Sequence, residues 1–284
     1  MRRCAQLLVL LALACRPAER GASTGAAPAR RIVSLAPSLT ELLFALGAGP
    51  QVVGRTAYCL YPPAARAVPS VGDGLNPSVE AIAARHPDLV LLYRSPQTET
   101  AARQLDALGI PTMLLKDDRM EDVARTARLL GRATGRAAAG DSIARVIDSL
   151  LAAPVLPTPT RARIAFVVWD APPIVIGSGS YLDELVAMAG AENVFHDLHT
   201  PSATVSLETI ASRDPDWIAI LRDSLNAQPP AWAGRREWRT VRAVREGRFL
   251  ILPAELFGQP SPRAPEAVAF LENLLNHSPL PAPQ

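Results

Sequence analysis

The chain contains the same kind of supersecondary unit twice, and this repetition limits what it can fold into. Apolar strands are predicted at residues 31–35 and 163–169, and each leads through a turn marked by proline into an amphipathic helix. Two such units favour two lobes, each built on a mainly parallel sheet. Ligands are usually held in crevices at the carboxyl ends of such strands and between domains. The repetition therefore predicts a protein that binds a ligand in a cleft.

Length and composition agree with this interpretation. The 284 residues are 49% apolar and 20% charged, which suits a globular chain with a proper core. The formal net charge is +2, and because Lys116 is the only lysine, scattered arginines carry the positive charge. Nucleic-acid binding needs clustered cations. Since no basic stripe occurs, we expect no nucleic-acid partner.

The first residues have the pattern of an export signal. Arg2 and Arg3 precede an uncharged run at 5–14, far shorter than the ~20 residues of a transmembrane helix. Residues 11–15 also resemble a bacterial lipobox, in which Cys15 would be lipidated and become the mature N-terminus. The alternative is ordinary signal cleavage at a nearby small residue. We predict a signal peptide at 1–15 and a flexible tether at 16–30, with the protein outside the cytoplasm, in the periplasm or at the cell surface.

Processing at this site leaves one thiol in the folded body. Cys4 and Cys15 both lie in the signal region, so Cys59 remains alone and no disulfide framework is possible.

The first half of the chain alternates between strand and helix patterns. Ser38 and Glu41 have the spacing of a capping box, and Asn76 followed by Pro77 predicts another helix start. Strands are expected at 51–54, 87–93 and 111–115, and helices at 38–47, 78–85 and 98–108. A long polar connection at 55–76 is of the kind that usually has a function.

The second half repeats the pattern after a long helical stretch. Apolar spacings of three and four continue from Met120 and predict two helices, the second at 137–153. We expect an N-terminal lobe at 31–135, a stiff interlobe helix at 136–154 and a C-terminal lobe at 155–284. Elements of the second lobe are expected at 163–169, 181–190, 207–212, 216–221 and 248–252, with a last helix after Ser261. The predicted fold class is α/β, with two Rossmann-like lobes, one long interlobe helix and a ligand cleft between the lobes.

Motifs of catalysis are missing from the sequence. It has no phosphate-binding glycine loop and no nucleophile elbow. The segment 177–180 reads as a tight turn in which Ser180 caps the next helix. His196 and His199 could form a metal pair, but a zinc site needs three or four converging ligands, and a solvated loop explains them as well. We therefore expect no enzyme, metal or cofactor, and keep a zinc-dependent hydrolase using these histidines as the alternative of another class.

Aromatic residues gather at predicted strand ends. Tyr58 and Tyr61 lie in the long connection, Tyr93 ends the strand 87–93, and Trp169 ends the strand 163–169. Such side chains offer flat apolar area with a polar tip. They could cap the sheets, but their position favours contact with a large planar ligand in the cleft.

The sequence also resembles a known family. The resemblance covers residues from 31 onward and depends on several motifs in order: Ser34-Leu35-Ala36-Pro37 with Thr40-Glu41-Leu42, Tyr58 with Tyr61-Pro62-Pro63, Pro87-Asp88-Leu89-Val90, Glu192-Asn193-Val194-Phe195 and Ser261-Pro262-Arg263. These are similar to the bacterial extracytoplasmic binding proteins with a helical backbone, which serve ABC importers of cobalamin, ferric siderophores and haem. The similarity is greatest to the members that bind cobalamin.

This resemblance implies a transport role. A monomer would bind a corrinoid between its lobes and deliver it to an ABC permease with its ATPase, while a lipid anchor holds it at the membrane. Ligand-contacting positions carry over to Pro37, Tyr58, Tyr93 and Trp169. Glu99 matches the acid of the first lobe that docks on the permease, although a solvated first-turn glutamate is an equal explanation.

Some positions depart from the cobalamin pattern. The acid by which the second lobe of such proteins docks on the permease has no matching motif in this sequence, and Glu237 is named only as a candidate. Aromatic residues of the cobalamin binder are replaced by Gly72, Ile174, Ser202 and Leu256. A haem or ferric-siderophore receptor, with Tyr58 or Tyr61 as iron ligands, therefore remains the alternative within the family.

Overall fold

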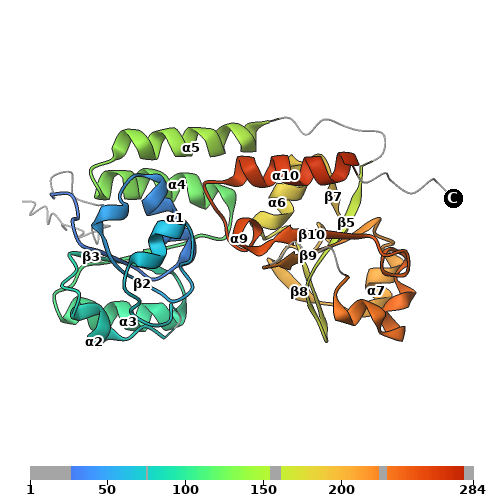
Figure 1. Cartoon of the computed structure of the whole chain (residues 1–284), viewed down its shortest axis with the longest axis horizontal. Helices are drawn as coiled ribbons and strands as arrows, with labels where there is room; N and C mark the ends of the chain where they lie inside the picture. The colour runs from blue at the N-terminus through green and yellow to red at the C-terminus, as the bar shows by residue number, and fades with distance from the viewer. Residues whose placement is uncertain (1–26, 75, 154–160, 224–228, 278–284) are drawn as a thin grey trace, which may run out of the picture.

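Two α/β lobes stand side by side in the computed structural model, with long helices running along one side of both (Figure 1). The structure describes residues 27–74, 76–153, 161–223 and 229–277. No helix in these ranges is both long enough and apolar enough to cross a membrane. The predicted fold class is confirmed. Cys4, Cys15 and the proposed signal peptide and tether up to residue 26 lie outside the described residues.

The first lobe has a four-stranded sheet in the order β2-β1-β3-β4, and all its pairings are parallel. Its strands are β1 (Ile32–Ser34), β2 (Val52–Arg55), β3 (Leu89–Tyr93) and β4 (Thr112–Leu115). The helices are α1 (Pro37–Ala45), α2 (Val79–Ala83), α3 (Pro96–Ala107) and α4 (Met120–Ala133), with short 3-10 helices η1 (Gly49–Gln51) and η2 (Pro63–Ala67). Parallel strands joined by helices bury both faces, which explains the continuous apolar runs in β1 and β3.

The second lobe has a six-stranded mixed sheet in the order β10-β9-β5-β6-β8, with β7 beside β5. Strands β10, β9, β5 and β7 run parallel, whereas β6 and β8 add antiparallel pairings. The strands are β5 (Arg163–Asp170), β6 (Pro173–Ile176), β7 (Glu192–Asn193), β8 (Ser202–Thr204), β9 (Trp217–Arg222) and β10 (Phe249–Pro253). The helices are α6 (Tyr181–Met188), α7 (Leu207–Ser212), α8 (Arg242–Arg245), α9 (Ala254–Phe257) and α10 (Ala264–His277), with 3-10 helices η3 (Ala231–Gly234) and η4 (Arg236–Thr240).

Helix α5 (Ala137–Ala152) occupies the range predicted for the interlobe helix. It packs lengthwise on α4 and also contacts α10 of the second lobe. Gly131 and Gly140 allow this close approach, because a Cβ added to Gly140 would lie 2.4 Å from the carbonyl oxygen of Ala127. The helix therefore belongs to a paired layer on the first lobe as much as to a bridge between lobes.

Two of the predicted helix starts are wrong. Helix α1 begins at Pro37, its N-cap is Ala36, and no side chain caps it, so Ser38 and Glu41 form no capping box. Proline has no N–H and suits the first turn without a cap. Helix α2 is capped by Ser78, whose hydroxyl accepts from the Ala81 N–H, and not by Asn76. The predicted cap Ser180 is confirmed, and the side chain of Ser206 also caps α7.

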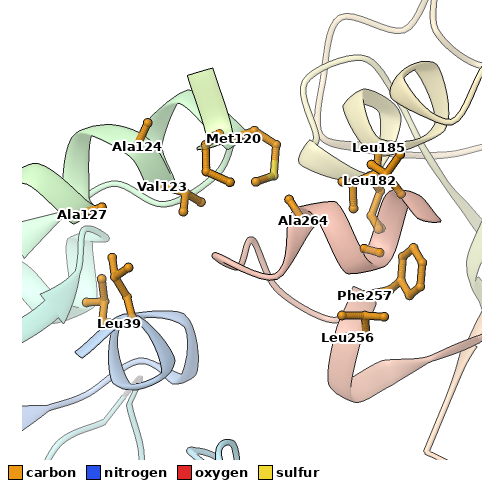
Figure 2. Packing of buried hydrophobic residues seen from close by; sticks show 14 of the residues in the cluster. Leu39, Met120, Val123, Ala124, Ala127, Leu182, Leu185, Leu256, Phe257 and Ala264 are labelled. Atoms are coloured by element: carbon orange, nitrogen blue, oxygen red, sulfur yellow. The ribbon is translucent and has the colours of Figure 1, made fainter. Parts of the chain in front are cut away.

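One apolar core continues through both lobes. Alternate residues of the strands point to opposite faces, and Ile32 and Leu91 in the first sheet and Phe166 in the second belong to the same buried cluster. Figure 2 shows its central part, where Met120 of α4 approaches Ala264 of α10, with Leu39 of α1 on one side and α6 and α9 on the other. The opposite sheet faces form separate cores, one in each lobe. The lobes are thus joined by packing as well as by the chain.

Candidate functional site

The carboxyl ends of the parallel strands carry the walls of a cleft between the lobes. A cavity of about 620 Å³, here called the arginine cavity, is lined from both lobes. The first lobe contributes Pro37, Tyr58, Leu60, Tyr61 and Arg66. The second lobe contributes residues at or after the ends of β9 and β10, among them Asp223, Pro253, Leu256, Gln259 and Arg263. This placement follows the rule for open α/β sheets, in which ligands lie beyond the carboxyl ends of the strands.

A second cavity of about 440 Å³, here called the aspartate cavity, extends the cleft into the first lobe. It shares four residues with the arginine cavity, so the two adjoin: Pro37, Tyr58, Gly258 and Gln259. Its other walls come from the ends of β1, β2, β3 and β4 and the segments after them, and they include Ser38, Thr56, Asp73, Tyr93 and Asp117. The structure therefore brings three predicted ligand positions together, namely Pro37, Tyr58 and Tyr93.

Tyr58 and Tyr61 have different environments in the cleft. Tyr58 is 68% exposed and lines both cavities. The ring of Tyr61 lies under the Arg263 guanidinium, 3.7 Å from the ring centroid to Cζ. Burial alone would lower the pKa of Arg263, but its hydrogen bond to Glu41 and the nearby negative charges raise it. Tyr61 is thus held by a permanent cation, whereas Tyr58 presents its ring to the cleft.

Buried polar contacts join the two lobes next to the cleft, where Gln259 and Arg263 are part of the lining. Glu41 is 2% exposed and accepts hydrogen bonds from Gln259 Nε2 at 2.9 Å, Ser261 Oγ at 2.5 Å and Arg263 Nε at 2.7 Å. Helix α1 is thereby fixed to the segment that leads into α10. A second link joins Arg119 to Glu184 of α6, with Nε to Oε1 at 2.9 Å. These links join the first lobe to the second.

Three acids lie where the first sheet meets α4. Asp118 accepts from Tyr93 Oη at 2.7 Å and pairs with Lys116 at 3.4 Å, and the hydrogen bond to Asp118 raises the pKa of Tyr93 to about 12. Burial works against ionisation of Asp122, but the backbone N–H groups of Asp118 and Arg119 and the Arg125 guanidinium lower its pKa.

Asp117 differs from both neighbouring acids. It is 8% exposed and lines the aspartate cavity. Burial raises its pKa to about 7, although a hydrogen bond with Ser38 acts in the opposite direction. The cleft therefore contains a carboxyl group that changes charge near neutral pH.

Trp169 lies apart from these residues. Its side chain is 60% exposed and lines a separate cavity of about 330 Å³ in the second lobe, together with Arg222, Trp232 and Arg235. The indole N–H donates to the Ala171 carbonyl oxygen at 3.0 Å. Trp169 and Tyr93 thus line different cavities, because Trp169 lies within the β5–β6 hairpin, where it pairs with Ile174 and its indole is on the surface of the second lobe.

The remaining predicted residues do not line the arginine cavity or the aspartate cavity. Glu99 is in the first turn of α3 and pairs with Arg94 at 3.6 Å, with Arg94 exposed and Glu99 half-buried. Glu237 is exposed in η4. Cys59 is fully buried with its sulfur 3.1 Å from Thr56 Oγ1.

The two histidines do not converge. His196 Nδ1 lies 2.8 Å from Asp183 Oδ2, while His199 Nδ1 lies 3.1 Å from Ser178 Oγ. Within the described ranges, no group of three or more His, Cys, Asp or Glu side chains could hold a metal ion. Each imidazole instead has a local hydrogen-bond partner.

Sequence reasoning missed Asp117 and Gln259. The run Lys116-Asp117-Asp118 follows β4 directly, so its position at a carboxyl strand end was a readable signal for Asp117. For Gln259 no local signal exists, since its role comes from a contact with Glu41, 218 residues away in the chain.

Two α/β lobes joined by a shared core, with a cleft at the strand ends, define a two-lobe ligand-binding protein. The chain belongs to the periplasmic binding protein family, whose profile matches residues 32–256. It is 29% identical to the vitamin B12-binding protein of Yersinia pseudotuberculosis over 221 residues, covering 76% of this chain and 75% of the relative. Proteins of this family carry no cofactor of their own and bind transported ligands outside the cytoplasm.

Two solved structures are similar over most of their length. The periplasmic vitamin B12 binding protein BtuF of Vibrio cholerae has a TM-score of 0.70 and 25% identity, covering 88% of this chain and 97% of BtuF. The periplasmic heme-binding protein BhuT, solved with two hemes, has a TM-score of 0.71 and 26% identity, covering 87% and 97% of the two chains. The chain is therefore a periplasmic binding protein, similar to members of the family that bind vitamin B12 or haem.

Proposed function

We propose that this protein binds cobalamin or a related corrinoid and delivers it to the permease of an ABC importer. The observation that carries the proposal is the interlobe cleft of two adjoining cavities, found in a chain similar over three quarters of its length to a vitamin B12-binding protein. Tyr58, exposed between the cavities, offers a flat face to a large ring system. The protein acts without catalysis, as a monomer.

Isothermal titration calorimetry with cyanocobalamin tests this ligand. We expect saturable heat at a 1:1 ratio and a thermal shift with ligand at tens of micromolar. Neither heat nor shift at that concentration would remove cobalamin as the ligand.

A haem or ferric-siderophore ligand is the second candidate. The exposure of Tyr58 favours it, because a free phenolate can ligate iron. Tyr61 is less suited, since Arg263 already covers its ring. An iron-dependent visible band that disappears in Tyr58→Phe would support this candidate over the corrinoid.

Delivery requires attachment and docking. We propose that Cys15 carries the lipid anchor, so Cys15→Ser should release the protein from membranes with unchanged ligand affinity. Glu99, which is half-buried on α3 with its side chain 43% exposed, is proposed to pair with an arginine of the permease. Glu99→Arg should abolish uptake without weakening ligand binding, whereas Glu121→Arg, an exposed first-turn acid of α4, should transport normally.

A further inference from the structure

The aspartate cavity differs in charge from the arginine cavity. Asp73 and Asp117 line the aspartate cavity, and the described residues around it include no lysine or arginine. The arginine cavity contains Arg66 and Arg263 together with three acids. The two ends of the cleft therefore present different chemistry to a ligand that fills both.

Of the three acids that follow β4, Asp117 is the one that lines the aspartate cavity. Asp118 is engaged by Tyr93 and Lys116, and Asp122 by backbone N–H groups and Arg125. The hydroxyl of Ser38 is the hydrogen-bond partner of Asp117. One hydroxyl occupies one of about four acceptor positions on a carboxylate. The group is also more than nine-tenths buried on the cavity wall, so a ligand placed there would exclude the remaining water from it.

We propose that Asp117 recognises the ligand in the aspartate cavity by accepting hydrogen bonds from a neutral or cationic N–H group, such as a primary amide. This inference rests on the proposed function and deepens it. A corrinoid carries primary amides around its ring and meets this requirement. Haem carries two carboxylates, and a carboxylate placed beside Asp117 would be repelled and left without a partner.

The surroundings of Asp117 make this recognition sensitive to pH. Charged or titratable groups face it from several elements: Asp118, Asp122 and Arg125 from the turn and α4, Tyr93 from β3 and Tyr181 from α6. Both tyrosines stay neutral, because their pKa values are raised. With the free pKa of Asp117 at about 7, mainly through burial, the carboxyl is largely protonated at pH 6. A ligand N–H donor binds the ionised carboxylate of Asp117 more strongly than the protonated carboxyl, so ligand binding releases a proton from Asp117.

The sign of the pH effect follows by linkage. Affinity for the amide ligand should be constant above about pH 8 and fall below pH 7, by at most about tenfold per pH unit. Calorimetry in buffers of different ionisation enthalpy should give release of up to one proton per cyanocobalamin between pH 6 and 7. This measurement uses the unaltered protein and does not depend on any variant folding.

The variant Asp117→Asn tests whether the pH dependence of ligand binding comes from the Asp117 carboxyl group. The side chain of the variant cannot ionise, so its affinity for cyanocobalamin should be the same at pH 5.5 and 8.5, and binding should release no proton. At pH 8.5 this affinity should be about tenfold lower than that of the unaltered protein. Its affinity for haemin should rise. Asp106→Asn makes the same chemical change on an exposed acid of α3 and should keep the original pH profile.

The outcomes distinguish the two proposals. Cyanocobalamin binding without proton release, or with proton uptake, overturns the role of Asp117 and leaves the corrinoid function standing. No cyanocobalamin binding between pH 5.5 and 8.5 overturns both. Proton release that persists in Asp117→Asn assigns the titration to another group and also overturns the role of Asp117.

Discussion

Glu41 and Arg263 are 222 residues apart in the chain and form an ion pair of 2.7 Å between the two lobes. Glu41 is buried on α1, and Arg263 precedes α10, so the contact joins the first helix of one lobe to the last helix of the other. The same guanidinium covers the ring of Tyr61 at the cleft. One buried acid therefore both fixes the lobes and shapes the ligand surface.

Glu41→Ala should destabilise the protein strongly. It removes the acceptor of Ser261, Gln259 and Arg263, and breaking a buried pair costs about 3 to 5 kcal/mol. We expect about 3 kcal/mol, because Arg263 keeps Glu255 and Glu266 within 4 Å. Urea denaturation measures the loss. Glu41→Gln keeps an acceptor oxygen and should lose less. Equal stability of Glu41→Ala and the unaltered protein would show that the lobes do not depend on this contact.

Asp117→Asn should stabilise the protein at alkaline pH. The folded-state pKa of about 7 lies above the ordinary value of 3.8, so the folded state binds more protons between these values and stability falls as pH rises through this window. Because one pKa unit corresponds to about 1.4 kcal/mol, the gain at pH 8 is a few kcal/mol at most and vanishes near pH 3.5. Thermal unfolding of both proteins across this range tests the effect, and a constant difference would refute it.

Truncation to alanine should lower the folding stability strongly at Trp238 and hardly at all at Trp169. Trp238 is 1% exposed with its ring centroid 4.1 Å from that of Trp232, so Trp238→Ala should cost about 3 to 5 kcal/mol of folding stability. Trp169 is 60% exposed, and Trp169→Ala should change stability by less than about 0.5 kcal/mol. If Trp169 also contacts the ligand, its loss should weaken binding by about tenfold. Unfolding of Trp169→Ala would contradict the position described.

Tyr58→Ala should weaken ligand binding without destabilising the fold. Its ring is exposed between the two cavities, and a stacked aromatic contributes about 0.5 to 1.5 kcal/mol beyond its buried area. Affinity for cyanocobalamin should therefore fall about tenfold, as measured by calorimetry. Tyr58→Phe keeps the ring and should bind a corrinoid normally. A large loss in Tyr58→Phe would instead indicate that the hydroxyl oxygen is essential, as expected for iron ligation.

The elements of the fold were readable because they depend on local patterns. The strands β1, β3, β5 and β9 are continuous apolar runs, and the caps Ser180 and Ser206 follow from residue type and spacing. The hairpin strand β6 was missed, since it follows Pro172, begins at Pro173 and leaves an apolar run of only three residues. Its pairing with β5 is decided by tertiary structure.

The candidate site was readable only in part. Tyr58 and Tyr93 were predicted from their positions in the long connection and at a strand end, where parallel sheets place ligands, whereas Pro37 was predicted only from the family resemblance. The role of Glu41 was misread as a helix cap, because Ser38 and Glu41 have the spacing of a local motif while their actual partners lie elsewhere. Burial of Asp117 could not be read either, since its hydrophilic neighbours Lys116 and Asp118 suggest a solvated loop.

The apolar cluster shared by both sheets has a consequence for how the chain folds. Met120 of α4 and Leu182 of α6 are buried in the same cluster, so separating the lobes would expose side chains that each lobe alone cannot cover. The two halves should consequently melt together in a single calorimetric transition, with equal calorimetric and van't Hoff enthalpies. Although the sequence repeats one unit twice, thermodynamically it specifies one folding domain.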